Sequence, residues 1–186
     1  RQLMKQDCSV VMFARDAERL EMLANTLWRG VAIAGDVTNQ ADCERLIEET
    51  LTRFDKIDGV INCAGIIEPI DTLEKADLEA WAHVYNVNVL GALRVSQLAL
   101  PHLFKQTGRI INVSSKAVEE LKPGFGAYST SKAALDHVTK MLAYENEQIV
   151  CVAVGPGAID TDMQKVIARE TIERDDIVGR FFQRLP

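Results

Sequence analysis

Short, almost entirely apolar runs alternate along the chain with longer segments in which apolar residues recur at helical spacing. The runs are rich in β-branched side chains, as is typical of strands that are buried on both faces. The segments between them are long enough for the helical crossovers that parallel strands need. The predicted strands are Ser9–Ala14, Val31–Gly35, Gly59–Cys63, Arg109–Val113 and Ile149–Val154. The pattern predicts an α/β fold, a doubly wound parallel sheet with helices on both faces.

The chain of 186 residues is most simply a single domain, because its 47% hydrophobic content is enough for one core and no repeat or linker divides it. No apolar run is long enough to cross a bilayer. The net charge of −6 argues against nonspecific binding to nucleic acid. The four cysteines, Cys8, Cys43, Cys63 and Cys151, lack the spacing of metal ligands, so we expect no metal site. We interpret them as mostly buried thiols of a cytoplasmic protein.

Polar or glycine-rich residues follow every predicted strand. The carboxyl ends of parallel strands line one edge of an open sheet, and ligands bind in the crevice at that edge. The residues that the strands deliver there are Ala14-Arg15-Asp16, Asp36-Val37, Asn62-Cys63-Ala64-Gly65, Ser114-Ser115 and Gly155-Pro156-Gly157. The sequence therefore predicts one ligand-binding crevice that is built from all five strands.

A tyrosine and a lysine stand four residues apart, at Tyr128 and Lys132, shortly after Ser115. Residues four apart share a helix face, so the ammonium can lie beneath the phenol and favour its ionised form. Such a tyrosine can donate and accept a proton near neutral pH, as the reduction of a carbonyl or the oxidation of an alcohol requires. The spacing by itself is a hypothesis that depends on the rest of the chain.

The order and spacing of several motifs resemble the short-chain dehydrogenase/reductase family over nearly the whole chain. These motifs are Asn62-Cys63-Ala64-Gly65, Asn88, Ser115, Tyr128 with Lys132, and Pro156-Gly157 followed by Thr161. Within that family, the stretch from Gly155 to Gln164 looks most like the sepiapterin reductases and the fungal benzil reductases. The resemblance implies a Rossmann fold and hydride transfer between a nicotinamide dinucleotide and a small carbonyl substrate.

The resemblance implies four catalytic residues. Tyr128 would protonate the substrate oxygen, and Ser115 would hydrogen-bond to that oxygen. Lys132 would favour the ionised phenol and hold the nicotinamide ribose, while Asn88 would anchor a water that leads to the lysine. Helical periodicity alone places Asn88 on an apolar face, where the alternative is a satisfied core asparagine that kinks its helix.

The resemblance also implies a cofactor site. Asp36 and Val37 would contact the adenine, and Ile159 and Thr161 would hold the nicotinamide carboxamide. Contacts with the rest of the cofactor would come from Asn62, Ala64, Gly65, Tyr128, Lys132, Pro156 and Gly157. Helix capping is the alternative for Asp36, and a plain turn is the alternative for each glycine-containing segment.

Arg15 decides which cofactor the resemblance implies. Relatives that prefer NAD carry an acidic residue one position earlier, where this chain has Ala14. A guanidinium with no carboxylate beside it suits the 2′-phosphate of NADP(H). An ordinary surface arginine is the alternative.

Three features depart from the family pattern. The family's first strand and its glycine-rich phosphate loop would precede Arg1, and a closing C-terminal strand is also absent. The first strand lies mid-sheet in the family, so a fold without it would leave ladder hydrogen bonds unmade at a cost of about 1 kcal/mol or more per group. We therefore expect the native polypeptide to carry about twenty further N-terminal residues, enough for a strand and its loop. Cys63 stands where many relatives have asparagine.

These observations predict an NADPH-dependent enzyme that reduces a ketone or diketone, with no nucleic-acid or membrane partner. The resemblance implies a homodimer or homotetramer that forms through the helices around Asn88 and Tyr128. Two alternatives remain: a non-catalytic dinucleotide-binding regulator or scaffold, and an NAD-linked alcohol dehydrogenase on the same fold. The segment after Met163 fits the family's substrate lid and fits an ordinary pair of surface helices equally well.

Overall fold

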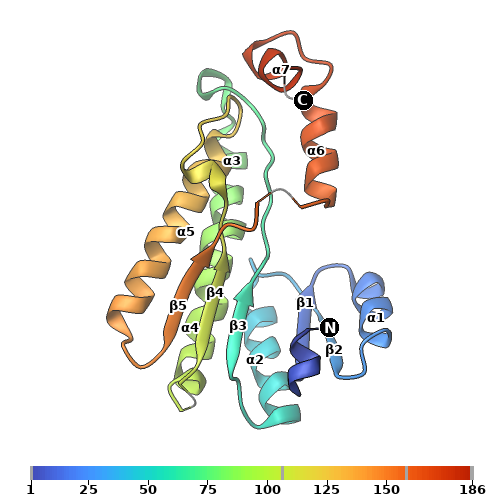
Figure 1. Cartoon of the computed structure of the whole chain (residues 1–186), viewed down its shortest axis with the longest axis vertical. Helices are drawn as coiled ribbons and strands as arrows, with labels where there is room; N and C mark the ends of the chain where they lie inside the picture. The colour runs from blue at the N-terminus through green and yellow to red at the C-terminus, as the bar shows by residue number, and fades with distance from the viewer. Residues whose placement is uncertain (1, 106, 158, 185–186) are drawn as a thin grey trace.

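Five parallel strands form two sheets in the computed structural model, which describes residues 2–105, 107–157 and 159–184 (Figure 1). One sheet has two strands and the other has three, in the order β3-β4-β5. The bounds are β1 (Val10–Ala14), β2 (Gly30–Ala34), β3 (Gly59–Asn62), β4 (Arg109–Val113) and β5 (Val150–Val154). Each predicted strand is confirmed to within one residue at either end.

Helices connect the strands, as parallel pairing requires. They are α1 (Ala17–Asn25), α2 (Gln40–Phe54), α3 (Leu78–Tyr85), α4 (Ala92–Leu103), α5 (Gly126–Glu145), α6 (Asp162–Thr171) and α7 (Ile177–Phe182). Short 3₁₀ turns are η1 (Leu3–Gln6), η2 (Leu73–Lys75) and η4 (Lys116–Val118), and η3 (Asn86–Gly91) is a π-helical turn between α3 and α4. Side chains that accept hydrogen bonds from the first turn fix the starts of α1, α2, α3 and α7, namely Asp16, Asn39, Asp77 and Asp176.

The two sheets share one apolar core, although within the described ranges no strand lies between β1 and β3 to join the sheets by hydrogen bonds. Ile33 of β2, Leu46 of α2 and Val95 of α4 are buried together, and Phe13 of β1 and Val60 of β3 pack against them. The place between β1 and β3 is where the family's first strand was expected. The helix layer of α2 and α4 thus packs against both sheets.

Helices cover the two sheets unequally. Ile110 and Asn112 of β4 are buried on the side of α4 and α5, whereas Ile61 of β3 is 50% exposed and Val152 of β5 is 40% exposed on the opposite face. In Figure 1, β4 and β5 pass in front of α4 and α5. Helix α1 packs on the β1–β2 sheet and does not join the core that α2 makes with that sheet. The β1–β2 sheet therefore has a helix on each face. No helix in these described ranges is long and apolar enough to cross a membrane.

The cysteines differ from the expectation of mostly buried thiols. Cys43 is buried in α2, but Cys8 and Cys63 are exposed and Cys151 is half-buried. Cys8 lies in the turn before β1, and Cys63 directly follows the last residue of β3. The apolar neighbours of these two cysteines in the sequence belong to strands, while the cysteines themselves lie just outside them.

Candidate active site

Lys132 lies beneath Tyr128 on the buried face of α5. The lysine Nζ is 5.8 Å from the centre of the tyrosine ring. It donates a 2.7 Å hydrogen bond to the main-chain oxygen of Val113, at the end of β4. Tyr128 is 8% exposed and Lys132 is 3% exposed. One helical turn therefore brings a phenol and an ammonium together at the carboxyl end of a strand.

Burial governs the charge of Lys132. Removal from water lowers the pKa of the Lys132 ammonium to about 8, and the negative charge of Asp136 opposes that shift, with a further contribution from Cys63. Asp136 follows one turn later on α5, and its Oδ1 is buried without a hydrogen-bond donor among the residues the structure describes. The ammonium is thus held in a site where its charge changes near neutral pH.

Asn88 is fully buried in the π-helical turn η3. Its Oδ1 accepts a 2.8 Å hydrogen bond from the Ile66 N–H, and its Nδ2 donates 2.9 Å bonds to the Ile66 oxygen and to Ser131 Oγ. A Cβ on Gly65 would lie 3.4 Å from both Asn88 Oδ1 and Lys132 Nζ. Asn88 is therefore a satisfied core asparagine, as one alternative held, and it also lies beside the lysine.

Ser115 ends the loop after β4 and begins the short turn η4. Its Oγ accepts a 3.1 Å hydrogen bond from the Ala117 N–H, and the hydroxyl proton has no acceptor within the described part of the chain. Ala117 is buried in the same apolar cluster as Tyr128. The half-buried serine hydroxyl is therefore fixed in place and remains free to donate.

Arg15 and Asp36 stand at the ends of β1 and β2. Asp36 Oδ1 accepts 2.8 Å hydrogen bonds from the N–H and the hydroxyl of Thr38, so it closes a turn as the capping alternative proposed. The Thr38 N–H, and to a smaller extent the positive charge of Arg15, lower the pKa of the Asp36 carboxyl. Arg15 is exposed and makes no ion pair with another described residue. A cation without an ion-pair partner among the described residues thus lies at the strand edge, and its charge acts on the Asp36 carboxylate.

Two predicted cofactor residues turn their side chains toward the protein interior. Asn62 Nδ2 donates to Ser96 Oγ at 3.0 Å and to Asn112 Oδ1 at 2.8 Å, so its amide joins β3 to α4 and β4. Val37 packs against Gly91, where a Cβ would come within 2.7 Å of the valine methyl. Both side chains make contacts inside the protein, so Asn62 can contact a cofactor only through its main chain.

The remaining predicted cofactor residues lie on exposed backbone at the same sheet edge. Ala64 follows β3, and after β5 come Pro156, Gly157, Ile159 and Thr161, all of them exposed. Gly157 has a φ of 80°, and a Cβ there would meet no atom within 4 Å. The backbone at this position is open to the approach of a ligand.

Helices α6 and α7, which we name the cover, close the other side of Tyr128. In Figure 1 they lie beyond the carboxyl ends of the strands. Tyr128 is buried in one apolar cluster with Phe125, Ile70 and Val178, and residues of the cover pack against it, namely Met163, Val166, Ile167 and Phe182. The tyrosine is therefore approached by charged and polar groups from the sheet and by apolar groups from the cover.

Sequence reasoning missed several residues of this site. Asp136 could have been found, because it stands four positions after Lys132 and shares its helix face. Ser131 lies within the tyrosine–lysine segment, but its bond to Asn88 spans 43 residues. The pairing of Asp71 with Arg174 has no local signal, since 103 residues separate the two.

A family comparison identifies the chain. The family model described as short chain dehydrogenase matches residues 1–171. The chain belongs to the short-chain dehydrogenase/reductase family. The family is one of dehydrogenases, which are oxidoreductases.

Two curated yeast proteins are similar to this family member. An uncharacterized oxidoreductase of Saccharomyces cerevisiae is 36% identical over 75% of this chain and 55% of its own length. The (S)-benzoin-forming benzil reductase of the same yeast is 32% identical over 80% of this chain and 59% of its own length. The resemblance to the fungal benzil reductases is thereby confirmed. The chain spans less than two thirds of the length of either relative.

Solved structures of the family share the fold. The KRED1-Pglu enzyme is 34% identical, with a TM-score of 0.88 over 96% of this chain and 75% of that one. An alcohol dehydrogenase of Thermococcus sibiricus, solved with 5-hydroxy-NADP, is 26% identical with a TM-score of 0.81 over 86% and 69% of the two chains. A 3-ketoacyl-(acyl-carrier-protein) reductase of Brucella melitensis, solved with NADH, is 28% identical with a TM-score of 0.84 over 88% and 70%. The doubly wound fold is confirmed.

Proposed function

We propose that the protein is an NADPH-dependent reductase that converts a ketone or diketone to an alcohol, with Tyr128 as proton donor. The observation that carries this proposal is the buried Lys132 ammonium, 5.8 Å from the centre of the Tyr128 ring at the carboxyl end of β4. Structural lysines seldom occupy such a position, because burial of an ammonium is costly unless its charge is used. The similarity to a benzil reductase supports a diketone as substrate.

The residues at the sheet edge fit a nicotinamide dinucleotide. A Cβ on Gly65 would fill the space between Lys132 Nζ and Asn88 Oδ1, so glycine keeps the backbone open beside the lysine. Gly157 leaves similar room on the β5 side. Arg15 supplies an exposed cation at the end of β1, and a guanidinium is suited to a phosphate monoester. We assign Arg15 to the 2′-phosphate of NADPH.

Bound NADPH would supply the hydride for this reduction. The carbonyl carbon of the substrate takes the hydride, and the oxygen takes the proton of the Tyr128 hydroxyl. Ser115 donates a hydrogen bond to that oxygen, since its hydroxyl proton has no acceptor among the described residues. Lys132 stabilises the resulting phenolate, and Asn88 anchors the water relay that returns a proton.

The charge pattern favours the transition state. Negative charge grows on the substrate oxygen and then on the phenol, and the Lys132 ammonium and the Ser115 hydroxyl are already in place. Preorganised groups of this kind contribute about 3 kcal/mol each in other enzymes. We further propose a homodimer or homotetramer, supported by exposed apolar side chains on η3 and α5, namely Leu90 and Met141.

Loss of NADPH absorbance with 1-phenylpropane-1,2-dione, benzil and simple ketones tests this function. Tyr128→Phe should lower turnover by at least about a thousandfold while NADPH affinity stays within about twofold. Tyr144→Phe is the matched control, because Tyr144 is on the same helix but is 81% exposed. Turnover by Tyr128→Phe, or an inactive wild-type protein that still binds NADPH, would overturn the proposal.

A further inference from the structure

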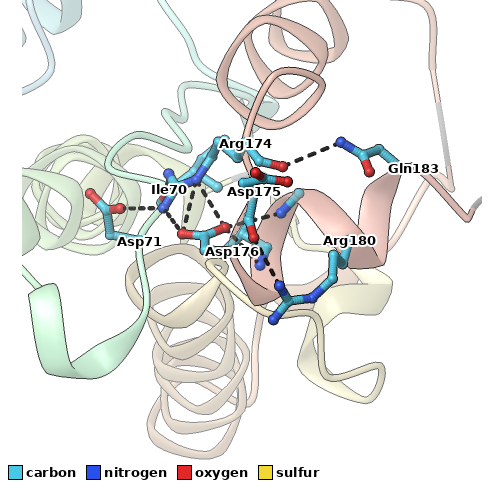
Figure 2. Close-up of polar contacts among 9 residues, drawn as sticks. Ile70, Asp71, Arg174, Asp175, Asp176, Arg180 and Gln183 are labelled. Carbon is cyan, nitrogen blue, oxygen red and sulfur yellow. Dashed lines mark hydrogen bonds and ion pairs between the residues drawn. The ribbon is translucent and has the colours of Figure 1, made fainter.

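Arg174 joins the cover to the loop that follows β3. Its Nη1 donates a 2.7 Å hydrogen bond to the main-chain oxygen of Ile70, and its Nη2 donates to Asp71 Oδ1 at 2.8 Å and to Asp176 Oδ2 at 2.6 Å. Figure 2 shows Arg174 reaching all three residues at once. One planar guanidinium thus connects two segments that are more than a hundred residues apart in the chain.

Asp176 connects Arg174 to the start of α7. Its Oδ1 accepts hydrogen bonds from the N–H groups of Val178 and Gly179, at 3.0 and 3.2 Å. The Asp71 and Asp176 side chains are 38% and 28% exposed, and that of Arg174 is 25% exposed. Hydrogen bonds from Arg174 lower the pKa of Asp176, so both partners stay charged through the neutral range. The first turn of α7 is therefore fixed by a charged network.

The loop end of this network leads to Tyr128. Asp71 forms a parallel β-bridge with Phe125, which lies three residues before the tyrosine. The rings of Phe125 and Tyr128 meet edge to face, with their centroids 6.2 Å apart. Gly124 has a φ of 84°, and a Cβ there would come within 2.9 Å of Ile70 and 3.1 Å of Val178. The loop, the start of α5 and the start of α7 therefore meet without spare room.

Apolar groups occupy the side of this junction that faces the tyrosine. Phe182 of α7 lies against Phe125, with ring centroids 5.3 Å apart, and Val178 is fully buried in the Tyr128 cluster. A substrate whose carbonyl reaches Tyr128 would bring its flanking group against the half-buried side chains of the cover that pack on this cluster, namely Met163, Val166, Ile167 and Phe182. Because the free energy gained by burying an apolar group is proportional to its buried area, an aryl flank gains much more binding free energy from the cover than a methyl flank does.

We propose that Arg174 is a positioning residue: it fixes α7 against the loop and thereby sets the affinity for substrates that carry an apolar group beside the reacting carbonyl. The inference rests on the proposed reductase function and identifies its substrate class as aryl or other bulky apolar ketones. Arg174 acts through Asp71, Phe125 and Val178 and does not touch the reacting atoms.

A matched pair of substrates separates this role from a general loss of stability. With 1-phenylpropane-1,2-dione, Arg174→Gln should raise KM about tenfold and leave kcat within about threefold. With butane-2,3-dione, whose methyl flank is too small to use the cover, KM should change by less than about twofold. Arg180→Gln is the control, since the Arg180 guanidinium bonds to the Asp175 oxygen within the same segment and, among the described residues, to no group of the loop after β3.

A second measurement follows the cover directly. Hydrogen exchange of the Val178 and Gly179 amides should accelerate in Arg174→Gln and remain unchanged in Arg180→Gln. Arg174→Lys keeps the charge without the planar fork and should show an intermediate KM. If Arg174→Gln does not fold, Asp71→Asn removes the same link from the other side and should give the same split between substrates.

The outcomes distinguish the two proposals. Absence of carbonyl reduction in the wild-type protein would overturn the reductase function itself. Reduction by the wild-type protein together with equal KM changes for both diketones, or with no change for either, would overturn the role of Arg174 and leave the reductase function standing.

Discussion

Lys132 sits under the ring of Tyr128, but its hydrogen bond goes to the main-chain oxygen of Val113 and not to the phenol. In the proposed mechanism the ammonium therefore acts on the tyrosine only through its charge, at a distance of 5.8 Å from the ring centre. A charge that is held by a main-chain carbonyl cannot swing away when the phenol changes protonation. In the proposed mechanism, catalysis then depends on the protonation state of the lysine.

The pH dependence of activity should follow Lys132. Burial lowers the pKa of Lys132 from 10.5 to about 8, so the ammonium is present below pH 8 and lost above it. Activity should accordingly fall as the pH rises through about 8. The same lysine should make the folded state more stable as the pH rises from 8 to 10.5. In that range the lysine of the unfolded chain still binds its proton, whereas the lysine of the folded chain has lost it.

Asp136 offers a direct test of this assignment. Its negative charge raises the pKa of Lys132, so Asp136→Asn should shift the alkaline limb of the kcat/KM profile to lower pH. Glu145→Gln, which removes an equal charge from the end of the same helix, should leave the limb in place. A profile of Asp136→Asn that coincides with the wild-type profile would show that this carboxylate does not influence the lysine.

Ser115→Ala should reduce kcat/KM by about a hundredfold or more, because the substrate oxygen loses the hydrogen bond from the Ser115 hydroxyl. NADPH affinity, measured by fluorescence titration, should not change. Ser129→Ala serves as the control, since among the described residues the Ser129 hydroxyl bonds to the Gly126 oxygen alone, within its own helix. A near-normal kcat/KM in Ser115→Ala would remove the serine from the proposed mechanism.

Arg15 should set the preference between cofactors. We expect the wild-type protein to favour NADPH, and Arg15→Ala to lower the NADPH to NADH ratio of kcat/KM by about tenfold or more through the loss of one charged phosphate contact. Arg53→Ala, an exposed arginine on α2, should not alter the ratio. A wild-type preference for NADH would contradict the assignment.

Asn112 should be important for stability and not for chemistry. It is 1% exposed, accepts from Asn62 and donates to Thr139 Oγ1 at 2.8 Å, so its replacement leaves buried polar groups without partners. Asn112→Ala should lower the free energy of unfolding in urea by about 2–4 kcal/mol. Gln40→Ala, at an exposed helix start, should change it by less than about 0.5 kcal/mol. Equal losses of unfolding free energy in Asn112→Ala and Gln40→Ala would mean that the hydrogen bonds of Asn112 contribute little to stability.

The sequence by itself determined the features that arise from near neighbours. The five strands follow from short apolar runs, and their ends deliver Arg15, Asp36, Gly65 and Ser115 to one edge because parallel strands share a direction. The pairing of Tyr128 with Lys132 follows from the helical repeat. Each of these depends on contacts within a few residues, or on a rule of strand direction that is independent of packing detail.

Tertiary structure alone decided where long-range side chains point. Asn62 looks like a ligand-binding residue in the sequence, yet its amide lies in the interior because Ser96 and Asn112 are brought to it by α4 and β4. Arg174 and Asp71 meet across 103 residues, and no periodicity encodes such a pair. The reason is physical: the local repeat fixes the direction of a side chain relative to its own element, whereas its partners depend on how the elements pack.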